Sequence, residues 1–214
     1  MKQVKARKDE ISGRSNKGVE GWMRGLKNGT VYHGHARFEG PRTVRVNDEV
    51  LEAGKIFINV GGRAFIPPLP GLSEVRYLTN SSMMDVDFLP EHLIIVGGSY
   101  IGLEFAQMYR RFGAQVTIVE KAPRLIPRED EDISAAVQKI LEAEGITIRL
   151  NAECITTGRQ NERIVVGLDC AEASRQVIGS HLLLAVGRVP NTADLGLDQA
   201  GVETDSAGYI KVYD

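Results

Sequence analysis

Several kinds of residue and segment are scarce in this sequence, and each scarcity excludes a class of protein. Cysteine occurs twice in 214 residues, too few for a disulfide-stabilised scaffold. The two cysteines and four histidines show no metal-ligand spacing, so we expect no metal site. No apolar run reaches the ~20 residues of a membrane-spanning helix, and the N-terminus lacks the apolar core of a signal peptide. We therefore expect a cytoplasmic protein without a membrane partner.

Charge of one sign is also lacking. The chain has 26 Lys and Arg against 28 Asp and Glu, a net charge of -2. Nonspecific binding of nucleic acid usually needs a basic surface, so we expect no nucleic-acid partner. The hydrophobic content of 43% is ordinary for a globular chain with a buried core.

The first part of the chain changes character twice. Residues 1–27 are charged and interrupted by glycines, which predicts a helix with a loose continuation. Residues 30–60 predict short strands, among them Thr30–Tyr32 and Ile56–Val60. The proline-rich segment 65–71 predicts an extended connector, and we expect a domain boundary near it.

The second part alternates between strands and helices. Leu93–Val96 and Val116–Val119 are continuous apolar runs, typical of strands buried on both faces of a parallel sheet. Ile146–Leu150 predicts a third strand, and the β-α-β-α-β order predicts right-handed crossovers. Short strands follow up to residue 186 and predict an antiparallel meander that includes Leu182–Val186. The predicted fold class is α/β, a Rossmann-like parallel sheet with an antiparallel meander.

A glycine-rich turn joins the first of these strands to its helix. The turn consists of Gly97, Gly98, Ser99, Tyr100, Ile101 and Gly102. In a dinucleotide-binding fold, one glycine makes the tight turn, one lets the backbone approach the pyrophosphate, and one lets the helix pack on the strand. Ser99 stands at the middle position, where its side chain either crowds the pyrophosphate or bonds to it. The helix N-terminus offers unpaired N–H groups to phosphates.

An acidic residue at the end of the second strand supports a dinucleotide site. Glu120 follows Gly97 by 23 residues, close to the ~20 typical of the acid that binds the adenosine ribose. Glu120 favours NAD(H), whereas Lys121, Arg124 and Arg128 could hold the 2′-phosphate of NADP(H). Both cofactors stay open.

Two other interpretations also stay open. The strand–turn–helix context of Ser99 fits the nucleophile elbow of a serine hydrolase, with His181 as the later histidine. Ile101, however, stands where that elbow has a glycine. A fold of this kind can also carry a glycine turn and an exposed acid without binding a ligand.

Four segments in order resemble the pyridine nucleotide–disulfide oxidoreductase family, the flavoproteins related to dihydrolipoamide dehydrogenase, glutathione reductase and mercuric reductase. They are Lys55–Gly62, Ile95–Glu104, Val116–Glu120 and Leu182–Asn191. The resemblance implies an oxidoreductase that passes hydride from nicotinamide to flavin and on to a disulfide or similar acceptor. It also implies NAD(H) and FAD as cofactors and a homodimer for the complete protein.

The resemblance assigns roles to individual residues. It implies that the glycine turn and Glu120 bind the nicotinamide dinucleotide, that Tyr100 covers the nicotinamide side of the flavin, and that Glu104 lies near the nicotinamide amide. The resemblance also implies Cys154 and Gly187 at the dinucleotide, and Lys121 and Val186 are further candidates beside them. Residues implied near FAD are Ala36, Gly61, Gly62 and Arg188.

The sequence also departs from the family pattern. The N-terminal FAD turn, the redox Cys-x-x-x-x-Cys pair and the catalytic histidine of the family are absent. We therefore expect residues 1–84 to be part of an FAD-binding domain, 85–187 an NAD(P)H-binding domain, and 188–214 the start of a return to the FAD-binding domain. We expect the chain as given to be catalytically incomplete, with no catalytic residue of its own. The alternative is a dinucleotide-binding module without redox activity.

Overall fold

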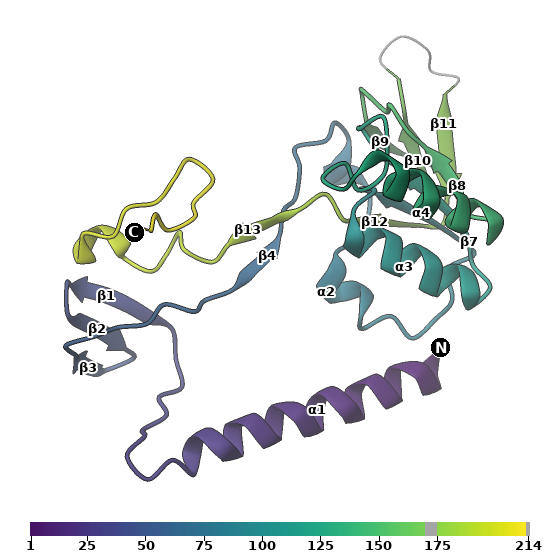
Figure 1. Cartoon of the computed structure of the whole chain (residues 1–214). Helices are drawn as coiled ribbons and strands as arrows, with labels where there is room; N and C mark the ends of the chain where they lie inside the picture. Colours follow the sequence, from purple (N-terminus) through teal and green to yellow (C-terminus); the bar gives the residue numbers. More distant parts are fainter. Residues whose placement is uncertain (170–174, 213–214) are drawn as a thin grey trace. The chain divides into compact units, whose positions relative to one another are not determined.

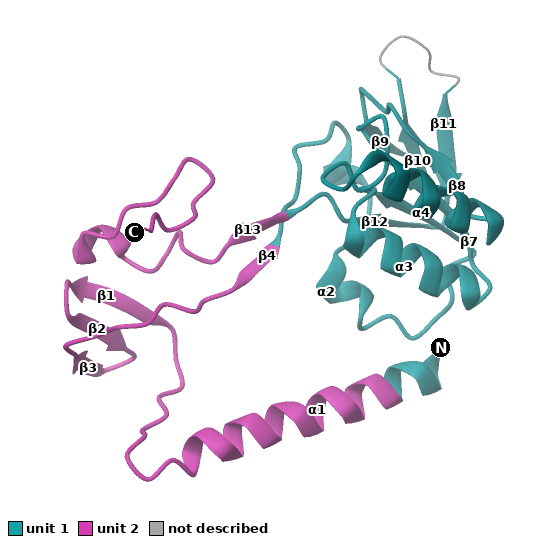
Figure 2. Cartoon of the chain, viewed as in Figure 1, with its two compact units in different colours: residues 1–6, 64–187 teal, residues 7–63, 188–214 magenta. Residues whose placement is uncertain are grey.

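The computed structural model describes residues 1–169 and 175–212. The chain divides into two compact units (Figure 2): unit 1 comprises residues 1–6 and 64–187, and unit 2 comprises residues 7–63 and 188–214. The boundary expected after residue 84 falls inside unit 1. The reason is that β5 (Tyr77–Leu78) pairs with β12 (His181–Leu184), far along the chain.

Unit 1 is built on a five-stranded parallel sheet in the order β5-β12-β6-β7-β8. Its remaining strands are β6 (His92–Val96), β7 (Gln115–Val119) and β8 (Thr147–Arg149). Helices α3 (Tyr100–Arg111) and α4 (Glu131–Ala143) connect them and cover one face of the sheet (Figure 1). Two short elements precede β6, η1 (Leu72–Glu74) and α2 (Asn80–Met83). The predicted Rossmann-like α/β fold is confirmed.

Strand β6 shows why its sequence is a continuous apolar run. Leu93 and Ile95 pack in the cluster that contains the apolar face of α3, with 0% exposure. Ile94 and Val96 point to the other face and pack in the cluster formed with the meander, with 0–1% exposure. Because both faces of the strand are covered, every position in it must be apolar or internally hydrogen-bonded.

The meander consists of β9 (Thr156–Gln160), β10 (Arg163–Gly167) and β11 (Gln176–Gly179), which pair antiparallel in the order β11-β10-β9. The expectation that Leu182–Val186 belongs to this meander is wrong. Residues 181–184 form β12, which lies in the parallel sheet between β5 and β6. Its three leucines are 0–1% exposed, which requires cover on both faces that a meander edge lacks.

Unit 2 contains β1 (Ala36–Gly40), β2 (Thr43–Val46) and β3 (Glu49–Glu52), an antiparallel sheet in the order β1-β2-β3. A second pair joins β4 (Gly62–Ala64) to β13 (Arg188–Pro190), and η2 (Leu197–Ala200) follows. The strands predicted at Thr30–Tyr32 and Ile56–Val60 are absent. Within the second of these segments the side chain of Phe57 is 90% exposed, so its β-forming sequence has no apolar surface to pack on.

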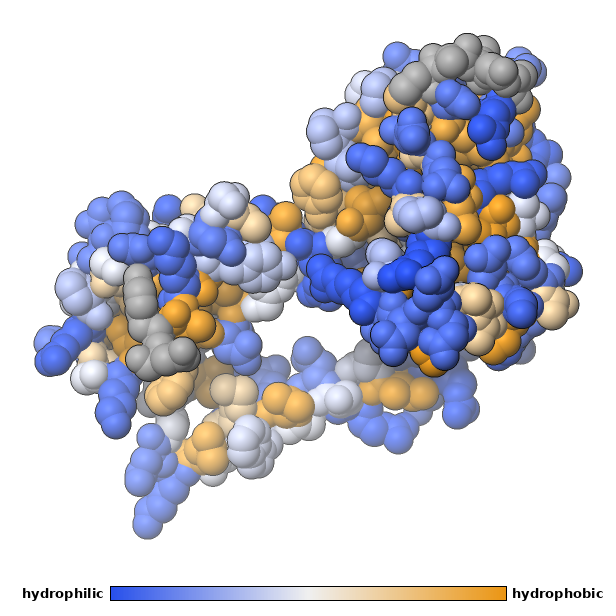
Figure 3. All heavy atoms as spheres, turned by 45° about the horizontal axis from the view of Figure 1, so that its top comes forward, coloured by the Kyte–Doolittle hydropathy of each residue, from blue (hydrophilic) through white to orange (hydrophobic). Residues whose placement is uncertain are grey.

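Helix α1 (Lys2–Arg24) is continuous through its glycines, so the predicted loose continuation begins only near residue 25. None of its residues is buried, and Trp22 is 68% exposed. Apolar side chains at the surface appear as orange atoms in Figure 3. Ion pairs one turn apart, Arg14 with Glu10 (2.6 Å) and Arg24 with Glu20 (2.9 Å), support the helix. In the described part of the chain, no helix combines the length and apolarity that crossing a bilayer needs.

Candidate functional site

The glycine turn lies between the end of β6 and the start of α3. Gly97 has φ of 116°, and a Cβ there would lie 2.3 Å from the carbonyl oxygen of Ala185. A Cβ on Gly102 would lie 2.1 Å from the carbonyl oxygen of Gly97. Both positions therefore require glycine, one for the sharp turn and the other for the close approach of α3.

The remaining positions of the turn differ in their surroundings. A Cβ on Gly98 would lie 2.7 Å from the Leu125 side chain and 3.0 Å from that of Glu120. Ser99 is the N-cap residue of α3, is exposed, and makes no side-chain capping bond. Its hydroxyl is therefore not used to hold the helix end, while Ile101 packs against the core cluster on the helix side of the sheet.

Glu120 lies at the carboxyl end of β7 and is joined to the turn. Its carboxylate accepts hydrogen bonds from the N–H of Gly98 (2.5 Å) and the N–H of Ala122 (2.8 Å). These two bonds fix the carboxylate beside the turn, where the side chain remains half-buried. Each oxygen keeps a further lone pair, so the group can also accept hydrogen bonds from hydroxyls.

The three cations that follow Glu120 are not equivalent. The guanidinium of Arg124 donates to the carbonyl oxygens of Pro127 (3.2 Å) and Glu129 (3.3 Å). Arg124 is therefore engaged inside the loop between β7 and α4. Lys121 and Arg128 are exposed.

Tyr100, the first residue of α3, contacts this same loop. The residue is 54% exposed, and its phenol donates a hydrogen bond to the carboxylate of Glu129. That hydrogen bond is the main reason why the pKa of Tyr100 is raised above its ordinary value. Glu129 was not predicted as a site residue, and its place in an acidic run was its only signal. Glu104 is exposed within the first turns of α3.

Two further segments come close to the turn. Residues 185–186 pass beside Gly97, with the backbone N of Val186 3.1 Å from a Cβ built there, and Gly187 follows with φ of 132°. The N–H of Ala152 donates to the carbonyl of Glu120 (3.1 Å), which brings the segment before Cys154 beside Glu120.

Cys154 is half-buried and disulfide-bonded, so it is not a free thiol beside the turn. The second cysteine in the sequence, Cys170, lies outside the described residues.

The arrangement separates Ser99 from His181, the histidine that the serine-hydrolase interpretation would use. Ser99 follows the carboxyl end of β6, whereas His181 begins β12 and pairs with Leu93 at the opposite end of the sheet. His181 instead bonds through Nδ1 to Ser180 Oγ (3.0 Å) and packs its ring on Phe88, with ring centroids 4.8 Å apart. The geometry therefore does not favour nucleophilic chemistry at Ser99.

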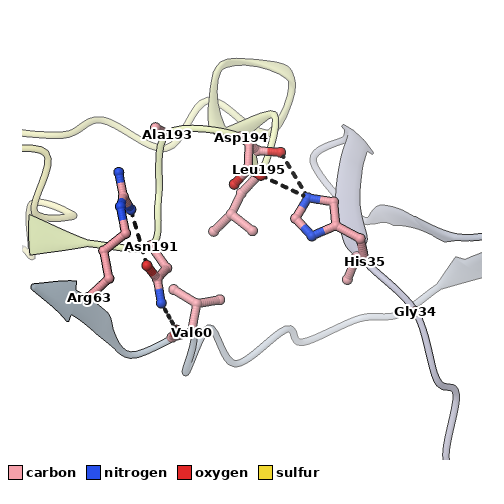
Figure 4. Close-up of a pocket in the computed structure, with 9 residues that line it drawn as sticks. Gly34, His35, Val60, Arg63, Asn191, Ala193, Asp194 and Leu195 are labelled. Atoms are coloured by element: carbon pink, nitrogen blue, oxygen red, sulfur yellow. Dashed lines mark hydrogen bonds and ion pairs between the residues drawn. The ribbon is translucent and has the colours of Figure 1, made fainter. Parts of the chain in front are cut away.

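Unit 2 contains a pocket of about 770 Å³ (Figure 4). Such a volume is ordinary for a small-molecule site. Two interacting side-chain pairs line it. Asp194 Oδ2 lies 3.3 Å from His35 Nε2, and Arg63 Nη1 donates to Asn191 Oδ1 (3.1 Å). The other lining residues are Gly34, Ala36, Val60, Ala193 and Leu195.

The residues implied near FAD lie in or close to this pocket. Ala36 lines it. Gly61 accepts a hydrogen bond from the N–H of Asn191 (3.1 Å), and Gly62 accepts one from the guanidinium of Arg188 (2.5 Å). Gly61, Gly62 and Arg188 thus hold β4 to the segment around β13. No local pattern links His35 to Asp194, because they are 159 residues apart along the chain.

Within residues 1–169 and 175–212, no group of three or more His, Cys, Asp or Glu side chains is placed to hold a metal ion.

The parallel sheet, its crossover helices and the glycine turn define an α/β protein of the Rossmann-like class. The chain belongs to the pyridine nucleotide-disulphide oxidoreductase family, whose sequence profile matches residues 1–214. The family resemblance carried by the four sequence segments is therefore confirmed.

Individual relatives agree with this assignment. A mercuric reductase of Streptomyces lividans is 39% identical over 187 residues, covering 85% of this chain and 39% of that protein. A dihydrolipoyl dehydrogenase of Thermus scotoductus is 32% identical over 216 residues, covering 99% of this chain and 46% of that protein. The solved structure of the flavoprotein disulfide reductase RclA from Escherichia coli has a TM-score of 0.90 at 32% identity, covering 99% of this chain and 48% of that one. The chain spans less than half the length of these relatives.

Proposed function

We propose that the chain is the NAD(P)H-binding part of an FAD-dependent oxidoreductase and is catalytically incomplete as given. When both cofactors are bound, they supply hydride transfer from nicotinamide to flavin, with electrons passing to a disulfide or similar acceptor. The parent protein would be a homodimer. The single observation that carries the proposal is the glycine turn with Glu120 bonded to it.

The residues around the turn fit a dinucleotide. With no Cβ at Gly97, Gly98 and Gly102, the backbone of the turn stays tight and α3 starts close behind it. The N–H groups at the start of α3 and the positive end of its helix dipole would then face the pyrophosphate. Glu120 would accept hydrogen bonds from the adenosine ribose, with Lys121, Val186 and Gly187 as neighbours. We propose NAD(H) as the preferred cofactor, because Arg124 is engaged by loop carbonyls.

The pocket of unit 2 fits part of a second nucleotide. Ala36 would present its backbone to the adenine half of FAD, and Asn191 and Arg63 offer polar atoms along the same wall. Gly61, Gly62 and Arg188 would hold the wall in place. Within unit 1, Tyr100 and Glu104 would face the nicotinamide end of the dinucleotide.

Titration of the 214-residue chain with NADH, NADPH and FAD tests the proposal. We expect NADH to bind. Glu120→Ala should lower the affinity for NADH at least about tenfold, since a hydrogen bond to a charged group contributes ~1.5–3 kcal/mol. NADPH binding should weaken less, because removing the carboxylate also removes its repulsion of a 2′-phosphate. Isothermal titration calorimetry measures both affinities.

Glu162→Ala is the matched control, because Glu162 is an exposed carboxylate paired with Arg159 in the turn between β9 and β10. It should leave both affinities unchanged. Unchanged NADH binding in Glu120→Ala would contradict the proposed site. Binding of NADH without FAD would favour the alternative of a dinucleotide-binding module without redox activity.

A further inference from the structure

Tyr100 and Glu129 form a contact between two segments of the proposed dinucleotide site. The phenol belongs to the first residue of α3, and the carboxylate belongs to the loop 121–130 that follows β7. Tyr100 is 54% exposed, so burial does not hold its side chain in place. Glu129 is half-buried, although its neighbours Arg128 and Asp130 are exposed. The contact therefore depends on the hydrogen bond itself.

The loop 121–130 is anchored to the turn at its middle. The N–H of Ile126 donates to the carbonyl of Gly98 (2.9 Å), and the Leu125 side chain is fully buried. The hydroxyl of Ser134 in α4 donates to the carbonyl of Leu125 (2.7 Å). Residues 127–130 lie beyond this anchor. Arg124 holds them within the loop through the carbonyls of Pro127 and Glu129, and the Tyr100 phenol joins them to the start of α3.

The linked loop carries the groups that would meet the adenosine half of a dinucleotide. Lys121 and Arg128 are its exposed cations, and the N–H of Ala122 orients the Glu120 carboxylate (2.8 Å). A binding loop that is already fixed loses less conformational freedom when the ligand arrives, so the affinity is higher. Loosening its end should therefore weaken binding even in a variant that keeps the Tyr100 ring.

We propose that Glu129 is a positioning residue of the dinucleotide site: its carboxylate holds the Tyr100 phenol and thereby fixes the loop 121–130 against the start of α3. This inference rests on the proposed function, because it assumes that a dinucleotide binds at the turn. Glu129 itself touches no reacting atom in this role.

Two single variants separate the link from the charge of Glu129. Tyr100→Phe removes the hydrogen bond and keeps both the ring and the carboxylate. Glu129→Ala removes the bond together with a negative charge that by itself repels an anionic ligand. We expect each of these two variants to lower the affinity for NADH about three- to tenfold, the loss typical of freeing a few side-chain and loop torsions. Glu129→Gln keeps an acceptor oxygen and should restore most of the affinity.

The experiment is calorimetric titration of the full 214-residue chain with NADH and with NADPH. The double variant Tyr100→Phe/Glu129→Ala should bind no more weakly than the weaker single variant, because both changes remove the same link. Glu142→Ala is the control, since Glu142 is an exposed carboxylate of α4 that bonds Gln138 (2.9 Å). It should bind NADH as the unaltered chain does.

A spectroscopic readout tests the bond without a ligand. The ultraviolet titration of tyrosinate in the unaltered chain, minus that of Tyr100→Phe, isolates the ionisation of Tyr100. Its pKa should lie above the ordinary tyrosine value and return toward that value in Glu129→Ala.

The outcomes separate the two proposals. If the unaltered chain bound neither NADH nor NADPH, the proposed function would fail and this inference with it. If it bound NADH and both single variants bound equally well or more tightly, the positioning role alone would be overturned. Additive losses in the double variant would overturn it as well.

Discussion

At the scale of single residues, the turn at Gly97–Gly102 is determined by the absence of side chains. Gly102, in the first turn of α3, is the clearest case. Its missing Cβ leaves room for the carbonyl oxygen of Gly97 in the turn before the helix. Ser99 shows the opposite, since this exposed position tolerates a hydroxyl where the common pattern has glycine. Three of the glycines therefore shape the backbone, and the serine adds a polar group to it.

Gly102→Ala should destabilise unit 1 and weaken NADH binding together. The new methyl group would lie 2.1 Å from the Gly97 oxygen, so α3 must shift away from the turn. Overpacking of this kind costs about 1–3 kcal/mol in the free energy of unfolding, measurable by urea denaturation. Gly158→Ala is the control, because a Cβ on Gly158 meets nothing within 4 Å. Equal stability of the two variants would contradict the assigned role of Gly102.

At the scale of elements, a polar contact joins the meander to the parallel sheet, in addition to the apolar packing between them. His92, the first residue of β6, is 9% exposed, and its Nε2 hydrogen-bonds Thr117 Oγ1 of β7 (2.9 Å). Ser180, between β11 and β12, bonds the backbone of His92 through both its N–H and its hydroxyl. His92 is therefore bonded to β7 through its ring, and to the link between meander and sheet through its backbone.

This contact predicts a loss of stability in mild acid. Burial lowers the pKa of His92, and a hydrogen bond to the backbone of Ile178 offsets this only in part; burial also lowers the pKa of His181. The unfolded chain then binds protons more readily than the folded chain below the ordinary histidine pKa of ~6.5. The free energy of unfolding should be constant above that pH and fall below it, by at most about 1.4 kcal/mol per pH unit for each histidine.

Urea denaturation between pH 8 and pH 5.5 measures this dependence before most carboxylates titrate. The variant His92→Gln keeps a polar side chain and should flatten the slope. Because that variant could be unstable, His181→Asn provides a second test, with a smaller reduction of the slope. A slope unchanged in both variants would show that other groups cause the acid sensitivity.

At the scale of the whole molecule, the two units differ in the size of their cores. Unit 1 contains two clusters of buried apolar residues on the two faces of its sheet. Among the described residues of unit 2, four are buried: Val46, Thr192, Leu195 and Leu197. Since apolar burial is the main favourable contribution to stability, unit 2 has much less to hold it folded.

Native-state hydrogen exchange should therefore differ between the units. Amides of β1–β3 should exchange roughly a hundredfold faster, or more, than those of β6 and β7, because local openings range in free energy from near zero to the global value. Mass spectrometry of peptic peptides resolves the two sets. Comparable protection in β1–β3 and β6 would show that unit 2 is stabilised by contacts other than apolar burial.

The sequence by itself determined the features that depend on neighbouring residues. The apolar runs of β6 and β7 and the spacing of Gly97, Gly102 and Glu120 are local patterns. They sufficed for the Rossmann-like core and for the family resemblance, which the match over residues 1–214 confirmed. The same local reasoning erred at Ile56–Val60, where a strand-like sequence has no neighbouring strand to pair with.

The tertiary structure decided what depends on residues far apart in the chain. Strand β12 joined the parallel sheet because Leu182–Leu184 find cover only between β5 and β6. Two contacts, His35 with Asp194 and Tyr100 with Glu129, join residues whose local sequence does not indicate the partner. Such contacts form only when the folded backbone brings the partners together, so no local propensity or spacing specifies them.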